Sequence, residues 1–162
     1  MERWGFVVEK IPESLVDGER RPDYKVTCDK ITYLIEVKSR EDDKRELDRK
    51  KSVLEKGEIY AQHKPLVRKG SESRIIKDGC DQLKSYGSND CYRIVWLCAI
   101  DGVQLVKFEQ FKAALYGTTQ LMDLQGDSFY RPCFFFRNSD FFRYKHVLDA
   151  AIISTLDHIS LC

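Results

Sequence analysis

The sequence predicts a mixed α/β (α+β) fold in which helices flank a central mixed β-sheet. Three observations indicate this class. Short stretches of alternating apolar and polar residues precede residue 40, an amphipathic helical pattern covers residues 71–86, and Tyr92–Ile100 is almost continuously apolar. A chain of 162 residues normally forms one domain around one hydrophobic core, so we expect residues 1–162 to form a single domain.

The N-terminal part of the chain predicts three strands. Residues 6–11 alternate in polarity, and residues 24–28 do so again. Residues 31–38 are rich in β-branched and aromatic side chains, which favour strands. Because only Asp29-Lys30 separates the last two stretches, we expect them to pair as a β-hairpin with a two-residue turn.

Two helices are expected between these strands and the apolar run. Residues 42–56 contain many helix-favouring residues, and the helix is predicted to end at Gly57. Residues 71–86 place apolar side chains on one face and charged side chains, Glu72 among them, mostly on the other. The second helix is therefore predicted to pack on the core through its apolar face.

The C-terminal part, residues 101–162, is expected to add a hairpin, helices and strands to the same domain. Tyr92–Ile100 predicts a strand covered on both faces, and Asp101-Gly102 predicts a tight turn into a second strand at Val103–Phe108. The further expected elements are a helix at 109–116, a strand at 131–137 and a helix from Asp140 that Asn138 or Ser139 caps. From Ala150 onward the pattern fits a helix and a strand equally well.

Composition argues against several classes of protein. The 27 Lys and Arg against 26 Asp and Glu leave a net charge of +1, so the overall charge does not indicate nucleic-acid binding. The six cysteines have no CxxC spacing, which argues against a zinc or redox motif. The sequence contains no apolar run long enough to span a membrane and no signal-peptide core after Met1, so we expect a reducing, cytoplasmic setting.

Aromatic residues gather in the last third of the chain. They are Phe129, Tyr130, Phe134, Phe135, Phe136, Phe141, Phe142 and Tyr144. Packing in the core is the expected role for most of them, and stacking on nucleic-acid bases is the alternative.

The predicted hairpin brings together side chains that can act in catalysis. With Asp29-Lys30 as the turn, residues whose numbers sum to 59 face each other, so Asp23 lies opposite Glu36. Alternation along the strand places Lys38 on the same face as Glu36. Mg²⁺ and Mn²⁺ prefer oxygen ligands such as carboxylates, and a nearby lysine can orient a water molecule or stabilise charge that develops on a phosphate. The hairpin therefore predicts a metal-dependent site for phosphodiester hydrolysis.

A known nuclease motif has the same residues at the same spacing. Here Pro22-Asp23 is followed by 12 residues and then by Glu36-Val37-Lys38, and Gln82 and Tyr86 stand on the following helix. The first group resembles the PD-(D/E)xK motif of the restriction-endonuclease-like nuclease superfamily, and the second resembles the QxxxY element of its RecB-like branch. The resemblance covers roughly residues 4–100 and implies the restriction-endonuclease-like form of the predicted fold.

The resemblance also implies roles for these residues. The implied metal ligands for Mg²⁺ or Mn²⁺ are Asp23, Glu36 and the Val37 carbonyl, the implied catalytic lysine is Lys38, and the implied supporting or substrate-binding residues are Gln82 and Tyr86. The implied function is that of a nuclease, with DNA endonuclease activity favoured over cleavage of RNA. The alternative is a catalytically inactive module of the same fold that binds nucleic acid or a protein partner. A homodimer and a larger parent protein both remain open.

One feature departs from the pattern of the family. Many members take a further acidic residue from a helix that precedes the first strand, whereas Met1 stands almost at the start of the first strand predicted here. Glu2 and Glu9 are the candidates to replace that acid. Without a replacement, we expect a mechanism with one metal ion, or activity only within a longer protein.

Overall fold

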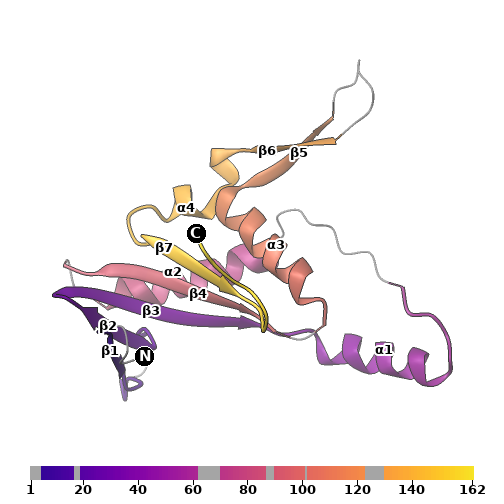
Figure 1. Cartoon of the computed structure of the whole chain (residues 1–162), viewed down its shortest axis with the longest axis horizontal. Coiled ribbons are helices and arrows are strands. Elements are labelled where there is room, and N and C mark those ends of the chain that lie inside the picture. The colour runs from indigo at the N-terminus through magenta and orange to yellow at the C-terminus, as the bar shows by residue number, and fades with distance from the viewer. Residues whose placement is uncertain (1–4, 17–18, 62–69, 87–89, 101, 123–129) are drawn as a thin grey trace.

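A six-stranded mixed sheet with helices on one side forms the body of the protein (Figure 1). The computed structural model describes residues 5–16, 19–61, 70–86, 90–100, 102–122 and 130–162. The elements in chain order are β1 (Val7–Lys10), β2 (Tyr24–Cys28), β3 (Ile31–Arg40), α1 (Lys44–Glu55), α2 (Gly70–Ser85), β4 (Tyr92–Ala99), α3 (Gln104–Tyr116), β5 (Thr118–Met122), β6 (Tyr130–Phe134), a 3₁₀ turn (Phe136–Asn138), α4 (Asp140–Arg143), β7 (Ala150–Ser154) and β8 (Ile159–Leu161). The predicted mixed α/β class is therefore confirmed for the described part of the chain.

The N-terminal hairpin has the predicted register. β2 pairs antiparallel with both β1 and β3, and Tyr24 lies opposite Ile35. The turn residues Asp29 and Lys30 both have positive φ, at 49° and 81°. Positive φ at both central residues is typical of the type I′ turn, whose twist matches that of the flanking strands. Residues whose numbers sum to 59 thus face each other, as predicted.

The middle of the sheet is parallel. The strand order is β1-β2-β3-β4-β7-β8, with β3, β4 and β7 parallel and β8 antiparallel to β7. The chain therefore crosses the sheet in one direction, first from β3 to β4 through α2 and then from β4 to β7 through α3. Crossovers between parallel strands are right-handed, so two steps in the same direction place both helices on the same face.

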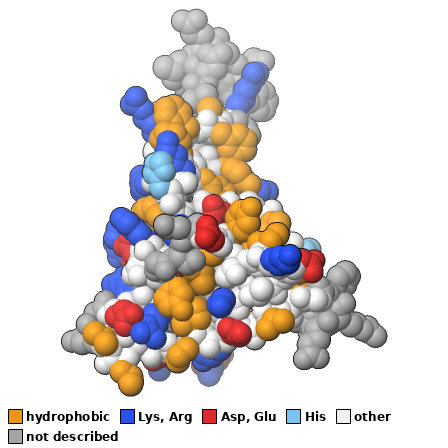
Figure 2. Space-filling view, turned by 90° about the vertical axis from the view of Figure 1, so that its left-hand side faces the viewer, with side chains coloured by type: hydrophobic (Ala, Val, Ile, Leu, Met, Phe, Trp, Pro, Cys, Tyr) orange, Lys and Arg blue, Asp and Glu red, His pale blue; other side chains and the backbone are white. Residues whose placement is uncertain are grey.

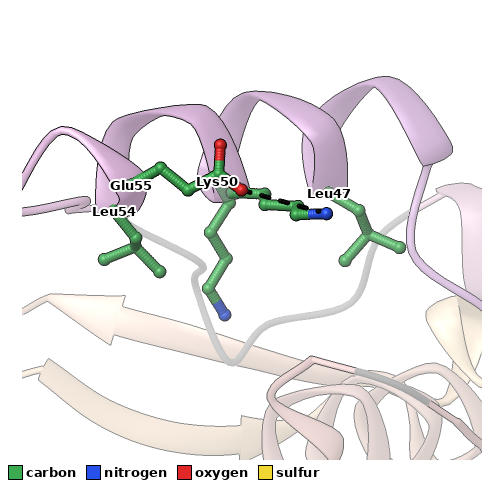
Figure 3. A pocket seen from close by; sticks show the side chains of 5 residues that line it. Leu47, Lys50, Leu54 and Glu55 are labelled. Atoms are coloured by element: carbon green, nitrogen blue, oxygen red, sulfur yellow. Dashed lines mark ion pairs between the residues drawn. The ribbon is translucent and has the colours of Figure 1, made fainter.

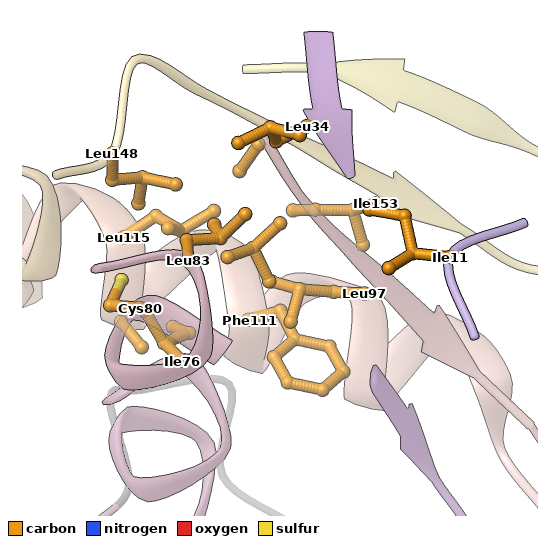
Figure 4. Packing of buried hydrophobic residues seen from close by; sticks show 13 residues of the cluster. Ile11, Leu34, Ile76, Cys80, Leu83, Leu97, Phe111, Leu115, Leu148 and Ile153 are labelled. Carbon is orange, nitrogen blue, oxygen red and sulfur yellow. The ribbon is translucent and has the colours of Figure 1, made fainter. Parts of the chain in front are cut away.

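The hydrophobic core lies between that face and the helices (Figure 4). Its largest buried side chains are Leu34, Val95, Leu97 and Ile153 from the sheet, Ile76 and Leu83 from α2, and Phe111 and Leu115 from α3. The predicted apolar face of the helix at 71–86 is therefore confirmed.

The two faces of the sheet differ in their cover. Leu34 and Glu36 of β3 point to the helices and are buried, and we call this side the covered face. Ile35 and Val37 point to the opposite side, which we call the open face. Among the described elements, helices flank the sheet on one face, because α2, α3 and α4 pack on the core side and α1 buries no residue. The expectation that Tyr92–Ile100 is covered on both faces is wrong, since alternate residues of β4 are only partly buried.

The main error among the predicted elements concerns Val103–Phe108. These residues form no strand but lead into and begin α3, whose second half is the predicted helix at 109–116. A short apolar run does not by itself distinguish a strand from a helix. The parallel pairing of β4 with β7 decides between them, because a parallel neighbour must be reached through a crossover rather than a tight turn. Asp101 lies outside the described residues.

The elements nearer the C-terminus largely agree with prediction. β6 occupies the first part of the expected strand at 131–137. The Ser139 hydroxyl caps α4 by accepting a hydrogen bond from the Phe142 N–H at 3.2 Å. The ambiguous stretch from Ala150 forms the strands β7 and β8.

Helix α1 projects away from the sheet (Figure 1). It matches the predicted helix at 42–56, begins after the N-cap Asp43 and is followed by Gly57 at a φ of 75°. It buries none of its residues, and its exposed Leu47 and Leu54 point from the same side of the helix as Lys50 (Figure 3). Its other residues are mostly charged.

The aromatic cluster is less buried than predicted. Phe141 and Tyr144 pack against the core, but four other members are exposed: Phe134, Phe135, Phe136 and Phe142. Cations lie over two of these rings, with Arg137 5.9 Å from the centroid of Phe136 and Lys145 4.9 Å from that of Phe142. Figure 2 shows orange and blue side chains side by side in the upper part of the molecule. Phe129 and the side chain of Tyr130 lie outside the described part.

Two expectations from composition can be compared with the structure. All six cysteines are free thiols. Within the described ranges, no helix combines the length and the apolar content that a membrane span requires.

Candidate active site

Asp23 directly precedes β2, and the hairpin places it beside β3. The backbone N–H of Ile11 donates to the Asp23 carbonyl at 2.8 Å, which continues the pairing of β1 with the β2 strand beyond Tyr24. Oδ2 of Asp23 accepts a hydrogen bond from the Val37 N–H at 2.8 Å. The carboxylate of Asp23 is thus fixed beside the residue that follows Glu36.

Glu36 is the most deeply buried member of the predicted site. It is 1% exposed on the covered face, and its Oε1 lies 2.7 Å from Lys38 Nζ. Its Oε2 is buried and has no hydrogen-bond partner. A buried anionic oxygen without a donor is costly, and a bound cation would satisfy it.

Helix α2 closes over this carboxylate at Gly79. A Cβ atom at Gly79 would lie 3.1 Å from Cγ2 of Val95 and 3.6 Å from Cγ of Glu36. The absence of a side chain therefore lets the helix lie close to β3 and β4. Gly79 stands inside the helical pattern of residues 71–86, and a glycine at such a position is a signal of close packing.

Lys38 links the strand to α2. Its Nζ donates to Oε1 of Gln82, and Nε2 of Gln82 donates to the Arg21 carbonyl at 3.4 Å. Gln82 thus joins Lys38 to the segment that precedes Asp23, as a supporting residue of the site would. Tyr86 follows the end of α2, where it is partly buried against the core.

Burial raises the pKa of the Glu36 carboxyl above its ordinary value of 4.5. The hydrogen bond from Lys38 and its positive charge oppose this change, and the backbone N–H of Asp23 opposes it weakly, whereas the negative charge of the Asp23 carboxylate adds to it. The Asp23 carboxylate is therefore close enough to Glu36 to influence its protonation. A buried carboxylate whose charge is disfavoured by a neighbouring carboxylate is an arrangement that a divalent cation relieves.

The donor set fits Mg²⁺ or Mn²⁺. Asp23 and Glu36 supply hard oxygen ligands, and Oε2 of Glu36 lacks any other partner. Among the described residues no group of three or more His, Cys, Asp or Glu side chains could hold a metal ion. Mg²⁺ commonly binds to only one or two carboxylates and completes its coordination with carbonyl, water and substrate oxygens, so two carboxylates are sufficient.

The candidates for a further acid differ in position. Glu9 lies opposite Lys25 on β2, which in turn lies opposite Leu34, so Glu9 shares the covered face with Glu36. Glu9 lies two strands away from Glu36. It is level with Leu34, the residue before Glu36 on the same face of β3. Glu2 lies outside the residues that the structure describes.

A second group of charged residues lies further along β3. Arg40 forms an ion pair with Glu72 of α2, which is fully buried. Nζ of Lys107 on α3 lies 2.9 Å from Oδ1 of Asp42, and it donates a hydrogen bond to the Arg40 carbonyl oxygen at 3.2 Å. The prediction that Glu72 belongs to the polar face of its helix is wrong, because the cation on β3 compensates its burial. These contacts attach α2 and α3 to the end of the strand that carries Glu36.

Comparisons with known proteins identify no relative of this chain, since no family model, curated protein or solved structure matches it. The resemblance to nucleases therefore depends on the spacing of the motif and on the geometry described above.

Proposed function

We propose that the chain is a metal-dependent nuclease of the PD-(D/E)xK type with a restriction-endonuclease-like fold, acting on DNA. The observation that carries the proposal is the buried Glu36, whose Oε1 contacts Lys38 Nζ, while its buried Oε2 lies close to Asp23 and has no hydrogen-bond partner of normal geometry. An unsatisfied anionic oxygen is difficult to explain in a purely structural strand. It has a clear role as a ligand for a divalent cation.

Each residue has a defined part in the proposed reaction. Asp23 and Glu36 would hold Mg²⁺ or Mn²⁺, with the Val37 carbonyl as the proposed third ligand. When bound, the cation would neutralise phosphate charge and lower the pKa of a water molecule. Lys38 would orient the attacking water or stabilise negative charge on the phosphate.

Gln82 acts in this proposal as a positioning residue. Its amide oxygen accepts a hydrogen bond from Lys38, which restricts the ammonium group to the side of Glu36. Tyr86, four residues later, is proposed to contact the substrate from the end of the helix. Both roles follow the resemblance to the QxxxY element.

The direct test is cleavage of supercoiled, linear and single-stranded DNA and of RNA, with Mn²⁺, Mg²⁺ or EDTA. We expect metal-dependent cleavage of DNA that Lys38→Ala abolishes. Lys112→Ala, which changes an exposed lysine on α3, serves as the control and should cleave normally. Absence of cleavage on all substrates, together with no Mn²⁺ binding by calorimetry, would exclude the proposal.

A second candidate function is a non-catalytic module that binds nucleic acid. It is favoured by the exposed phenylalanines that lie under cations, because stacked aromatic rings and basic groups are how proteins bind single strands. Fluorescence anisotropy with a labelled single strand separates the two functions. Binding that is independent of metal and weakened by Phe136→Ala, without any cleavage, would favour the binding module.

A further inference from the structure

The open face of the sheet is apolar across all six strands. Pairing registers and strand alternation assign to it Phe6 and Val8; Tyr24, Val26 and Cys28; Ile31, Tyr33, Ile35 and Val37; Tyr92, Ile94, Trp96 and Cys98; Ile152; and Ile159 and Leu161. Several of these side chains are well exposed, including Tyr92 at 53% and Ile159 at 72%. A monomeric protein rarely presents a continuous apolar surface of this extent, so the face is expected to be covered in solution.

Charge is almost absent from this surface. Among the described strand residues of the open face, the only charged side chain is Lys10, on the edge strand β1. An isologous interface places the same residues of both copies close to each other, so a charged face would repel its own copy. A sheet face with a single charge at its edge is therefore compatible with a second copy of itself, and besides Lys10 its described strand residues offer a charged partner no charged group for electrostatic recognition.

Helix α1 is poorly suited to cover this surface. It is unpartnered, but it offers only Leu47, Val53 and Leu54 as large apolar side chains, and its remaining residues are charged except for Ser52. Placing it on the open face would bury several charges against isoleucine, valine and tryptophan side chains. That desolvation is unfavourable without partners for the charges.

The size of the open face meets the need of a stable dimer. Six strands spaced about 4.8 Å apart and about five residues long span roughly 25 Å by 17 Å. Two such faces bury about 850 Å² as flat areas, and the relief of the side chains brings this to about the 1,000 Å² at which specific interfaces begin. Sheets packed face to face at about 10 Å are a common arrangement in proteins.

We propose that the protein forms a homodimer in which the open faces of two copies pack against each other, with Ile35, Val37 and Trp96 near the centre. In this dimer, the open face of each copy is covered by the open face of the other, because helices α2, α3 and α4 pack only on the covered face. The proposal does not depend on the nuclease chemistry, because Glu36 and Lys38 point to the covered face.

The test measures the mass of the full chain by sedimentation equilibrium from about 1 to 100 µM, with EDTA present. We expect the wild type to be dimeric in this range. Tyr92→Lys introduces a charge into the interface and should raise the dimer Kd at least 100-fold. Leu54→Lys is the matched control, because Leu54 is 52% exposed and lies on α1, and it should leave the Kd unchanged.

Val8→Lys is the second variant and changes a different strand of the open face. Circular dichroism and thermal unfolding establish which variants are folded, and both Tyr92 and Val8 are exposed enough to tolerate a lysine in the monomer. A wild type that is monomeric at 100 µM would overturn the proposal. So would dimers that survive both substitutions, or a Leu54→Lys variant that dissociates as readily as Tyr92→Lys.

Discussion

The covered and open faces of the same strand differ in what they bury. On the covered face of β3, Glu36, Lys38 and Arg40 follow one another at alternate positions, and each is paired with a charged or amide group. On the open face, Ile35 and Val37 occupy the positions between them and carry no polar side-chain atom. Along this part of β3, the face that is better shielded from water holds the charged side chains, and the less shielded face holds the apolar ones.

This distribution is the reverse of what stability alone favours. Buried charges are retained at a cost in folding free energy, which suggests that the covered face is organised for chemistry. An exposed apolar face is equally unfavourable for an isolated chain, which indicates association. The comparison is consistent with the two proposals, which assign a reaction to the covered face and assembly to the open face, and four changes test this assignment.

The largest expected effect is on catalysis from the covered face. Glu36→Gln keeps the shape of the side chain but removes an anionic ligand, so single-turnover cleavage with Mn²⁺ should fall at least about 1,000-fold, or about 4 kcal/mol in barrier. Ile35→Val, the neighbouring change on the open face, should alter the rate by less than about 2-fold. Equal losses in both variants would show that the two faces are not functionally distinct.

The next effect concerns the stability of the covered face. Arg40→Met leaves Glu72 buried without its cation and should lower the free energy of unfolding by about 3 kcal/mol in urea denaturation. Arg74→Met changes an exposed arginine of α2 and should have an effect below about 0.5 kcal/mol. Adding Glu72→Leu to Arg40→Met should recover most of the loss; if it does not, the pair is not the cause.

A smaller effect links pH to the covered face. Because burial raises the pKa of Glu36, the folded state keeps a proton that the unfolded state releases, so the free energy of unfolding should decline as pH rises from 4.5 through the raised pKa. Glu36→Gln cannot lose a proton and should lack this decline. At pH 8, without metal, the variant should be the more stable protein by about 1 kcal/mol. Urea denaturation of both proteins at pH 5 and pH 8 measures the difference. A wild type that becomes more stable relative to Glu36→Gln as the pH rises would contradict the prediction.

The smallest effect is at the turn that fixes both faces. Lys30 has a φ of 81°, where a side chain is strained, so Lys30→Gly should stabilise the protein by about 0.5–1 kcal/mol. Lys56→Gly is the control, since Lys56 ends α1 at a φ of −82° and gains nothing from glycine there. Cleavage should be unchanged in both variants. A destabilised Lys30→Gly protein would mean that the turn does not limit the hairpin.

Local rules in the sequence were sufficient for the hairpin and much of the site. A two-residue turn and strand alternation predicted which residues of β2 and β3 face each other, and hence that Asp23, Glu36 and Lys38 converge. Both rules depend on neighbours within a few residues, so one sequence contains them.

Non-local features could not be predicted in the same way. The helices pack on one face because β3, β4 and β7 follow one another in the same direction across the sheet. No local sequence pattern encodes this strand order. The helix at Val103–Phe108 follows from the parallel pairing of β4, and the burial of Glu72 follows from an arginine on a distant strand. The close approach at Gly79 depends on the position of Val95 in the next strand.

The placement of Glu36 on the face opposite the open one has a consequence for valency. In a dimer joined through the open faces, the two copies of Glu36 lie on opposite sides of the pair of sheets, and each points away from the interface. The two sites then cannot meet at one scissile phosphate or on the two sides of one short duplex. Such a dimer would instead hold two separate nucleic-acid segments, and so act as a bridge between them.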